Sequence, residues 1–187
     1  MASHKYQVMT QARAIAQLGN PVLRQQAQAV DEIQDQQLQQ LIDDLLLTVE
    51  KSNGVGIAAP QISASCRLFI VASRPNLRYP QAPTMEPTAM INPRIVAHTN
   101  EIVKGWEGCL SVPNVRGLVP RYRTITVEYC ARTGQPQQQE LTDFVARIFQ
   151  HELDHLDGIL FRDRVEDEQD LFTEAEYQKL ITEEIKG

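Results

Sequence analysis

The spacing of apolar residues predicts a first helix in the second quarter of the chain. Between positions 38 and 49, apolar residues recur three and four positions apart, which places them on one face of a helix. These residues are Leu38, Leu41, Ile42, Leu45, Leu46 and Val49. The Asn53-Gly54 pair that follows is typical of a helix end, so we expect the helix to end there.

A second helix is expected from about Thr142 to Asp157. Thr142 is a residue type that caps a first turn, and Asp143 complements the helix dipole there. Asp157 and Gly158 form a typical stop. The apolar face of this helix consists of Phe144, Val145, Ile148 and Phe149.

A third helix is expected near the C-terminus, from about Thr173 to Ile185. Thr173 and Glu176 have the spacing of a capping box, in which each side chain bonds the backbone N–H of the other residue. The apolar stripe of this helix consists of Tyr177, Leu180 and Ile181.

The middle of the chain has the pattern of β-strands. Three short segments are rich in β-branched or aromatic residues and are separated by Pro, Gly and Asn. They span residues 68–72, 89–96 and 123–129. Residues 74–87 contain four prolines and are interpreted as a surface loop. The pattern as a whole predicts an α+β fold, with strands packed around a central helix and another helix at each end.

Length and charge limit the classes of function. The 187 residues fit one compact domain, which we expect to span residues 13–187 behind a loose polar leader of residues 1–12. A net charge of −6 without a dense basic stripe argues against nucleic-acid binding. The apolar runs are too short for a membrane span, and the N-terminus lacks the order of a secretory signal.

The three cysteines are too few, and odd in number, for a disulfide framework. We therefore expect a cytoplasmic protein. Cys66 and Cys130 lie in or beside alternating apolar stretches and are interpreted as small buried hydrophobic residues. Cys109 lies in a different context and is a candidate for chemistry.

The most specific chemical signal is the pair His151 and His155, with Glu152 beside the first of them. Residues four positions apart lie above one another on a helix, so both imidazoles can bind the same metal ion. A glutamate at this position is the residue type that accepts a proton from a water held by such an ion. The spacing therefore indicates metal-assisted hydrolysis.

A catalytic ion of this kind usually takes a third protein ligand and leaves one position for water. Cys109 is the better candidate, because a thiolate binds transition ions strongly and the preceding Gly108 allows close backbone approach. Asp154 and Asp157 are alternatives. Asp154 projects to the side of the histidine pair, so it is interpreted as a partner of a ligand or as a solvated carboxylate.

Residues 54–61 (GVGIAAPQ) form a segment of small residues that another chain can approach closely. A phosphate-binding loop is disfavoured, because the segment lacks the required glycine and lysine spacing and follows a helix. An extended peptide laid against this backbone is a better interpretation.

Three segments together resemble the signature motifs of the peptide deformylases, in the same order. They are residues 54–61, residues 107–111 (EGCLS) and residues 150–155 (QHELDH), and the resemblance covers roughly residues 15–165. It implies an α+β fold of antiparallel strands packed with the metal-binding helix. It also implies a hydrolase that removes the N-formyl group from the initiator methionine of nascent polypeptides and releases formate.

The resemblance further implies a role for each motif residue. Glu152 is the general acid and base, while the Gln61 side-chain amide and the Leu110 backbone N–H stabilise the oxyanion. The implied ligands of one divalent transition ion are Cys109, His151 and His155. Fe(II) is the expected ion, and Zn, Ni and Co are alternatives.

Substrate contacts are expected from residues around these motifs. The peptide backbone would pair with Val55 and Gly56, and the family alignment suggests that Arg116 lies near the downstream peptide; a surface cation is the alternative. Glu107 and Trp106 are interpreted as structural. The residues assigned to substrate binding are Val55, Gly56, Gly108, Arg116, Phe144 and Ile148. The expected partners are N-formylmethionyl peptides and the ribosome exit region, without a nucleic acid or a membrane.

Two other functions remain open at this point. A zincin-like endopeptidase that cleaves internal amide bonds would share the histidine helix but would need a different third ligand. A non-catalytic metal-binding module would close its site with four protein ligands and would have no use for Glu152.

Overall fold

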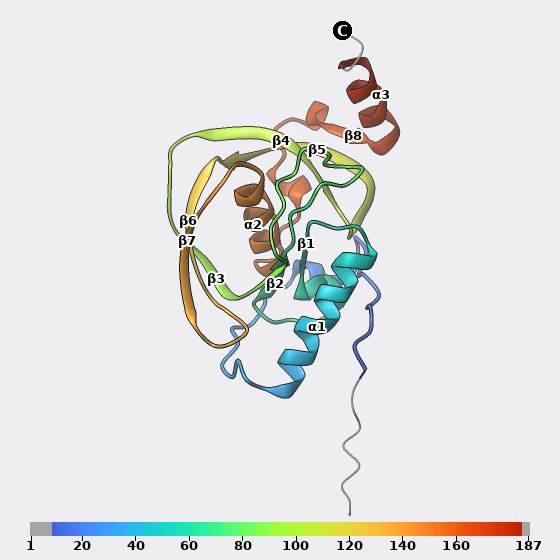
Figure 1. Cartoon of the computed structure of the whole chain (residues 1–187). Coiled ribbons are helices and arrows are strands. Elements are labelled where there is room, and N and C mark those ends of the chain that lie inside the picture. The colour runs from blue at the N-terminus through green and yellow to red at the C-terminus, as the bar shows by residue number, and fades with distance from the viewer. Residues whose placement is uncertain (1–8, 185–187) are drawn as a thin grey trace, which may run out of the picture.

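The structure is a computed structural model that describes residues 9–184. Three α-helices and two antiparallel sheets make up the described part of the chain (Figure 1). The helices are α1 (Gln36–Lys51), α2 (Asp143–Leu156) and α3 (Glu174–Glu184). Short 3-10 helices connect the larger elements: η1 (Pro21–Arg24), η2 (Ala59–Ile62), η3 (Phe161–Arg164) and η4 (Glu168–Asp170).

Both sheets pair neighbouring strands in antiparallel fashion. The larger sheet has the order β1-β2-β3-β6-β7, and the smaller has the order β4-β5-β8. The strands of the larger sheet are β1 (Gly56–Ala58), β2 (Leu68–Val71), β3 (Thr88–His98), β6 (Thr124–Cys130) and β7 (Pro136–Thr142). Those of the smaller sheet are β4 (Ile102–Cys109), β5 (Val112–Tyr122) and β8 (Leu171–Thr173).

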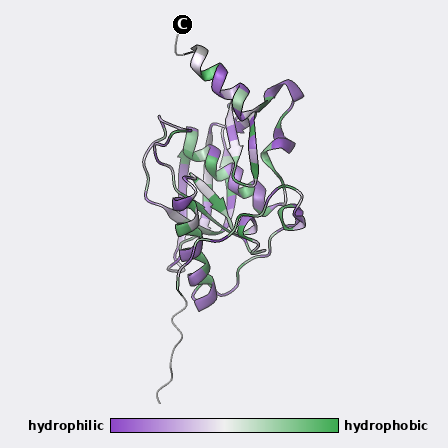
Figure 2. Cartoon of the chain, turned by 90° about the vertical axis from the view of Figure 1, so that its right-hand side faces the viewer, coloured by the Kyte–Doolittle hydropathy of each residue, from purple (hydrophilic) through white to green (hydrophobic). Residues whose placement is uncertain are grey.

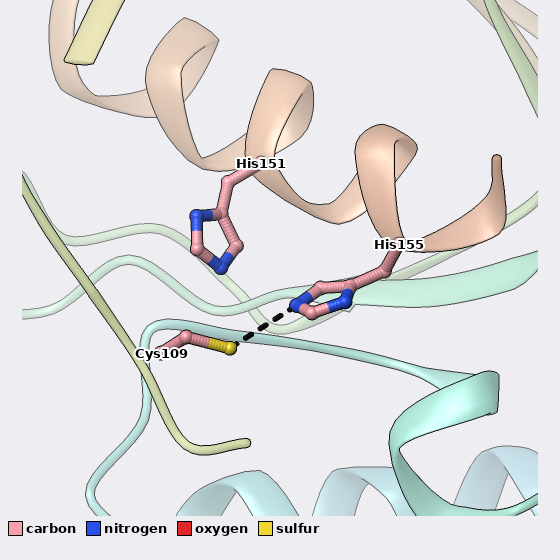
Figure 3. Close-up of side chains that lie close together, drawn as sticks. All are labelled: Cys109, His151 and His155. Atoms are coloured by element: carbon pink, nitrogen blue, oxygen red, sulfur yellow. Dashed lines mark hydrogen bonds between the residues drawn. The ribbon is translucent and has the colours of Figure 1, made fainter. Parts of the chain in front are cut away.

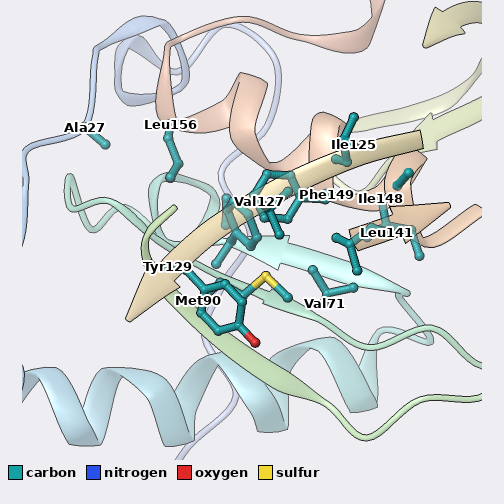
Figure 4. Close-up of a cluster of buried hydrophobic side chains, with 13 residues drawn as sticks. Ala27, Val71, Met90, Ile125, Val127, Tyr129, Leu141, Ile148, Phe149 and Leu156 are labelled. Carbon is teal, nitrogen blue, oxygen red and sulfur yellow. The ribbon is translucent and has the colours of Figure 1, made fainter. Parts of the chain in front are cut away.

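The larger sheet is covered on both faces near β2. Phe69 and Val71 belong to the core cluster around α2, in which Figure 4 shows Val71, while Leu68 and Ile70 belong to a second cluster with α1. Successive side chains of a strand face opposite sides of the sheet. All four residues of β2 are therefore buried, which explains why this strand is a continuous apolar run in the sequence.

Helix α2 contacts strands of both sheets: β1, β2, β6 and β7 of the larger sheet and β5 of the smaller one. Phe149, which Figure 4 shows within this core, packs edge-on against Phe69, and the two ring centroids lie 5.1 Å apart. Because α2 is enclosed, its polar side chains on the face toward the smaller sheet need partners from that sheet. These polar contacts between α2 and the smaller sheet hold the site described below.

The predicted α+β fold with antiparallel strands is confirmed, and the three predicted helices lie where the sequence patterns place them. The predicted capping box of α3 is present, since Thr173 N–H donates to Glu176 Oε2 and Glu176 N–H donates to Thr173 Oγ1. Helix α3 projects from the rest of the structure (Figures 1 and 2). The expected end of this helix at Ile185 lies outside the described residues.

Several strands were missed by the sequence patterns. Strands β4 and β5 pair along most of their length, yet β4 contains two glycines, Gly105 and Gly108, that resemble loop signals. Strand β7 lies at the edge of the larger sheet and is mostly polar, so it shows little apolar alternation. Apolar alternation therefore did not predict a strand where glycines interrupt it, as in β4, or where most side chains face solvent, as in β7.

Smaller expectations also need correction. Thr142 occupies the N-cap position of α2, but its side chain makes no capping hydrogen bond. Cys66 and Cys130 are half-buried at the border of the second core cluster instead of fully buried, and burial raises the pKa of the Cys66 thiol to about 11.

The predicted leader is only partly described. Residues 1–8 lie outside the described residues. Within the remainder, the Gln11 N–H donates to Asp44 Oδ1 at 2.9 Å, so this part of the segment is tied to α1. Among the residues that the structure describes, no helix is long and apolar enough to cross a membrane.

The core around Phe149 gives a first testable prediction. Phe149→Ala should lower the free energy of unfolding by about 3–5 kcal/mol, because the truncated ring leaves a cavity that the surrounding core cannot fill. Chemical denaturation measures the change, with Val96→Ala at an exposed strand position as the control. A loss below about 1 kcal/mol for Phe149→Ala would contradict the central position of this side chain.

Candidate metal centre and adjoining pocket

Three potential metal ligands converge between β4 and α2. Cys109 is the last residue of β4, and His151 and His155 lie one turn apart on α2 (Figure 3). Their ligand atoms all lie within 4.8 Å of one another, and Cys109 Sγ is 3.2 Å from His155 Nε2. The fold thus brings Cys109 to two histidines that lie 42 and 46 positions further along the chain, and the three predicted ligands meet.

The electrostatics of these side chains favour a cation. Burial alone would raise the pKa of the Cys109 thiol, but the imidazoles of His155 and His151 lower it well below its ordinary value. A thiol with a lowered pKa gives up its proton more readily, and the thiolate is the form that binds a metal ion. Sulfur and imidazole nitrogen are ligands that Fe(II), Co(II), Ni(II) and Zn(II) accept, so the donor set fits a divalent transition ion.

Glu107 orients one of the two imidazoles. His151 Nδ1 donates to Glu107 Oε2 at 2.9 Å, which leaves Nε2 directed to the ligand cluster. Arg121 donates to both carboxylate oxygens of Glu107, at 2.9 and 3.0 Å. Burial opposes ionisation, yet Arg121 and His151 hold the pKa of Glu107 well below its usual range.

Asp154 belongs to the same buried network and is not solvated. Its carboxylate accepts hydrogen bonds from Arg121 Nη1 at 2.6 Å and from Arg164 Nη2 at 2.7 Å. Since Arg121 in turn binds Glu107, Asp154 is connected to His151 through two intermediate residues. Of the two sequence-based interpretations of Asp154, the partner role fits its surroundings and the solvated carboxylate does not.

Gln61 is held with its amide nitrogen toward the cluster. Ala58 N–H donates to Gln61 Oε1 at 2.8 Å, which fixes the orientation of the amide. Gln61 Nε2 then lies 3.1 Å from Ser111 Oγ and 3.5 Å from Cys109 Sγ. Ser111 also donates its backbone N–H to Cys109 Sγ at 3.4 Å. The Gln61 amide is therefore preorganised beside the candidate metal position.

Glu152 follows His151 on α2, and the residue is 4% exposed. Its Oε2 atom is buried and has no hydrogen-bond partner within the described part of the chain. Burial raises the pKa of Glu152 to about 7, although His151 and His155 act in the opposite direction. A carboxyl group with a pKa near neutrality can both accept and return a proton.

Gly56 allows β1 to pass close to this carboxyl group. A Cβ atom at position 56 would lie 2.9 Å from the Glu152 carboxyl carbon and 2.9 Å from Ile148 Cγ2, which is closer than real Cβ contacts. Only glycine therefore fits between the strand and the Glu152 side chain.

A pocket opens beside Glu152 and contains most of the predicted substrate and catalytic residues. Tyr79 from the 74–87 loop and Trp106 from β4 also line it, and Trp106 packs against Phe172 and Tyr177 as well. The predicted residues that line the pocket are Val55, Gly56, Gln61, Gly108, Leu110, Phe144, Ile148 and Glu152.

Arg116 is placed differently from the other predicted residues. Its side chain is 2% exposed and is not part of the pocket lining. Arg116 Nε donates to Glu174 Oε2 at 2.7 Å, and Nη1 donates to Tyr79 Oη at 3.1 Å. The alternative of an ordinary surface cation does not hold, because the guanidinium lies between the 74–87 loop and α3.

Sequence reasoning missed three residues of the pocket, Arg78, Tyr79 and Arg147. Tyr79 lies in the proline-rich segment that was interpreted only as a surface loop, and it packs on Phe144 with ring centroids 4.8 Å apart. Arg147 precedes His151 by four residues and therefore lies on the same helix face. A charged residue on that buried stripe was the signal that could have identified it.

Comparisons with known proteins place the chain among deformylases. The polypeptide deformylase family matches residues 12–170. Peptide deformylase 2 of Nostoc sp. (strain PCC 7120) is 67% identical over 172 residues, which cover 92% of this chain and 96% of that protein. Peptide deformylase 2 of Shewanella oneidensis is 46% identical over 172 residues, covering 92% and 90%.

A solved structure agrees with these sequence matches. The crystal structure of a class I type b peptide deformylase from Acinetobacter baumannii with Met-Ala-Ser bound has a TM-score of 0.82 and 45% identity to this chain. The match covers 84% of this chain and 100% of the other.

The hydrogen bond between Glu107 and His151 predicts an effect on metal affinity. Glu107→Gln should raise the dissociation constant for Co(II) or Zn(II) about 10- to 100-fold, because the imidazole loses its charged orienting partner. Competition with a chromogenic chelator measures the constant. Glu140→Gln, at an exposed position of β7, is the control, and equal affinities for the two variants would contradict the assigned role of Glu107.

Proposed function

Because this chain belongs to the polypeptide deformylase family, it is a metal-dependent hydrolase that removes the N-formyl group from nascent polypeptides, and we propose which of its residues carry out the reaction. The observation that carries the proposal is the convergence of Cys109, His151 and His155 within 4.8 Å, with the buried carboxyl group of Glu152 beside them. Neither the endopeptidase nor the non-catalytic module is favoured by the family matches.

We propose that Cys109, His151 and His155 hold one divalent ion, expected to be Fe(II), with Zn, Ni and Co as alternatives. The thiolate character of Cys109 and the fixed ring of His151 support this assignment. When bound, such an ion polarises the formyl oxygen and lowers the pKa of a water molecule in its open position.

Glu152 is proposed to move the protons. Its carboxylate accepts a proton from the attacking water as the water oxygen bonds to the formyl carbon. The bond between that carbon and the peptide nitrogen then breaks, formate leaves, and Glu152 returns the proton to the departing amine. The unpaired, buried Oε2 atom of Glu152 supports this role, because a reacting group would satisfy it.

Gln61 and Leu110 are proposed to stabilise the oxygen of the formyl group as negative charge develops on it. The Gln61 side chain would donate from Nε2, and Leu110 from its backbone N–H. Two facts support the assignment: Ala58 fixes the Gln61 amide before substrate binds, and both residues line the pocket. Donors held in advance at such a position contribute about 100- to 1000-fold in rate each.

The peptide substrate is proposed to extend the larger sheet at β1. β1 is the terminal strand in the order of that sheet and pairs with β2 on one side only, so its other edge at Val55 and Gly56 can receive an extended chain. The methionine side chain would enter the pocket lined by Phe144 and Ile148. The relative from Acinetobacter baumannii binds Met-Ala-Ser, a peptide that begins with methionine, which supports a peptide of this kind as the ligand.

The predicted contact of Arg116 with the downstream peptide is proposed in a modified form. Its guanidinium hydrogen-bonds to the Tyr79 hydroxyl, and Tyr79 lines the pocket. We propose that Arg116 acts on that part of the peptide through Tyr79, which it holds in place, and that Gly108 leaves space for this guanidinium. A Cβ atom at position 108 would lie 2.6 Å from Arg116 Nη1.

The cellular setting follows from the substrate. We propose that residues 13–187 act as one catalytic domain in the cytoplasm and meet formylated chains near the ribosome exit region, where such chains emerge.

Substrate choice gives the direct test of the function. The metal-loaded protein should release formate from formyl-Met peptides and should leave internal amide bonds of blocked peptides intact. A formate assay and mass spectrometry of the two peptide sets measure these outcomes. Release of internal fragments without formate would instead support the endopeptidase.

Replacement of the proposed general base gives a second test. Glu152→Ala should lower turnover about 100- to 10,000-fold while the protein still binds its ion, because proton transfer is lost and the three ligands remain. Formate release and elemental analysis are measured on the same samples, with Glu140→Ala as the control. Unchanged turnover in the Glu152 variant would refute the proposed role of this residue.

A further inference from the structure

Arg147 is a buried cation in the pocket whose contacts the reaction described above does not use. Its side chain is 11% exposed, and it extends from α2 across the smaller sheet. Nη2 donates to Val103 O at 2.6 Å, and Nη1 donates to Val119 O at 2.7 Å. A single guanidinium thus connects α2 to both β4 and β5.

The same Nη1 group also reaches Glu107. It lies 3.0 Å from Glu107 Oε1 and 3.3 Å from Gly105 O. Glu107 Oε1 therefore accepts from Arg147 and Arg121, while Oε2 accepts from Arg121 and His151. With donors on both oxygens, the carboxylate cannot rotate freely, and the ring of His151 is fixed through it.

Gly105 provides the space that this arrangement requires. A Cβ atom at position 105 would lie 2.8 Å from Arg147 Cζ and Nη2. The planar guanidinium is held between the strand backbone and its carbonyl acceptors, so a bulkier residue at position 105 would displace it. This contact explains why β4 contains a glycine at position 105, although glycine is a poor strand former.

Arg147 also forms part of the pocket wall, together with Phe144 and Ile148 from the same helix. From these contacts we propose that Arg147 is a positioning and specificity-determining residue, which orients His151 through Glu107 and limits how far a side chain can enter the pocket. This inference rests on the proposed function of the pocket. Lysine cannot replace it fully, because an ammonium group lacks the planar fork that reaches several fixed acceptors.

The test compares Arg147→Met with Gly105→Ala, which keeps the arginine and displaces its guanidinium. Both variants should release Zn(II) to a chelator about 10-fold faster than the unmodified protein, because His151 is less firmly oriented. Arg147→Met should also shift the ratio of kcat/KM for formyl-Phe over formyl-Met peptides upward by about 10-fold, because the shorter side chain leaves a deeper pocket. Arg147→Lys should change the Zn(II) release rate and the substrate ratio in the same direction, but by less than Arg147→Met does.

The double variant separates this mechanism from a general loss of packing. Once Arg147 is replaced by Met, Gly105→Ala should add nothing further to either quantity, since the displaced group is already gone. Arg123→Met is the matched control, because Arg123 also binds a residue of α2, Asp143, but at the exposed surface. This control should leave both quantities unchanged.

A failure of the inference about Arg147 can be distinguished from a failure of the proposed function. If the unmodified protein releases no formate, the function is wrong, yet the Zn(II) release rates still test the positioning role. Arg147→Met with an unchanged Zn(II) release rate and an unchanged substrate ratio would overturn the inference, as would fully additive effects in the double variant.

Discussion

The candidate centre depends on one buried carboxylate, that of Glu107. It accepts hydrogen bonds from Arg121, Arg147 and His151, and Arg121 also donates to a second carboxylate, that of Asp154. Buried charges are tolerated only when they are paired, and removal of one partner destabilises the fold because the remaining charge is buried without a counter-ion. The network therefore fixes α2 against the smaller sheet, and with it the direction in which His151 presents its free nitrogen.

Glycines in β4 are the counterpart of this network. Gly105 faces the guanidinium of Arg147, and Gly108 faces that of Arg116. Arg147 comes from α2 and donates to carbonyl groups of β4 and β5, whereas Arg116 comes from β5 and binds α3 and the 74–87 loop. Strand β4 thus has glycines at two positions where a side chain would collide with an arginine. The two arginines, Arg147 and Arg116, can therefore lie close to the strand that ends at Cys109.

The parts of the molecule that the sequence could predict are those with local signals. The helix patterns, the β2 run and the His151–His155 spacing each lie within a short stretch, and so the fold class and the ligand set could be predicted. The contact of Arg116 with Tyr79 and the contact of Arg147 with Glu107 join residues that lie 37 and 40 positions apart in the chain. No local pattern encodes those contacts, which is why Arg147 and Tyr79 were missed and why the bonds of Arg116 to Tyr79 and Glu174 could not be predicted.

The central claim is that one sulfur and two imidazole nitrogens bind a single ion and leave a position for solvent. X-ray absorption spectroscopy of the zinc-loaded protein tests it most directly. The account predicts one sulfur at about 2.3 Å, two nitrogens at about 2.0–2.1 Å and one oxygen from solvent. A spectrum without sulfur, or one with a fourth protein ligand in place of the oxygen, would contradict it.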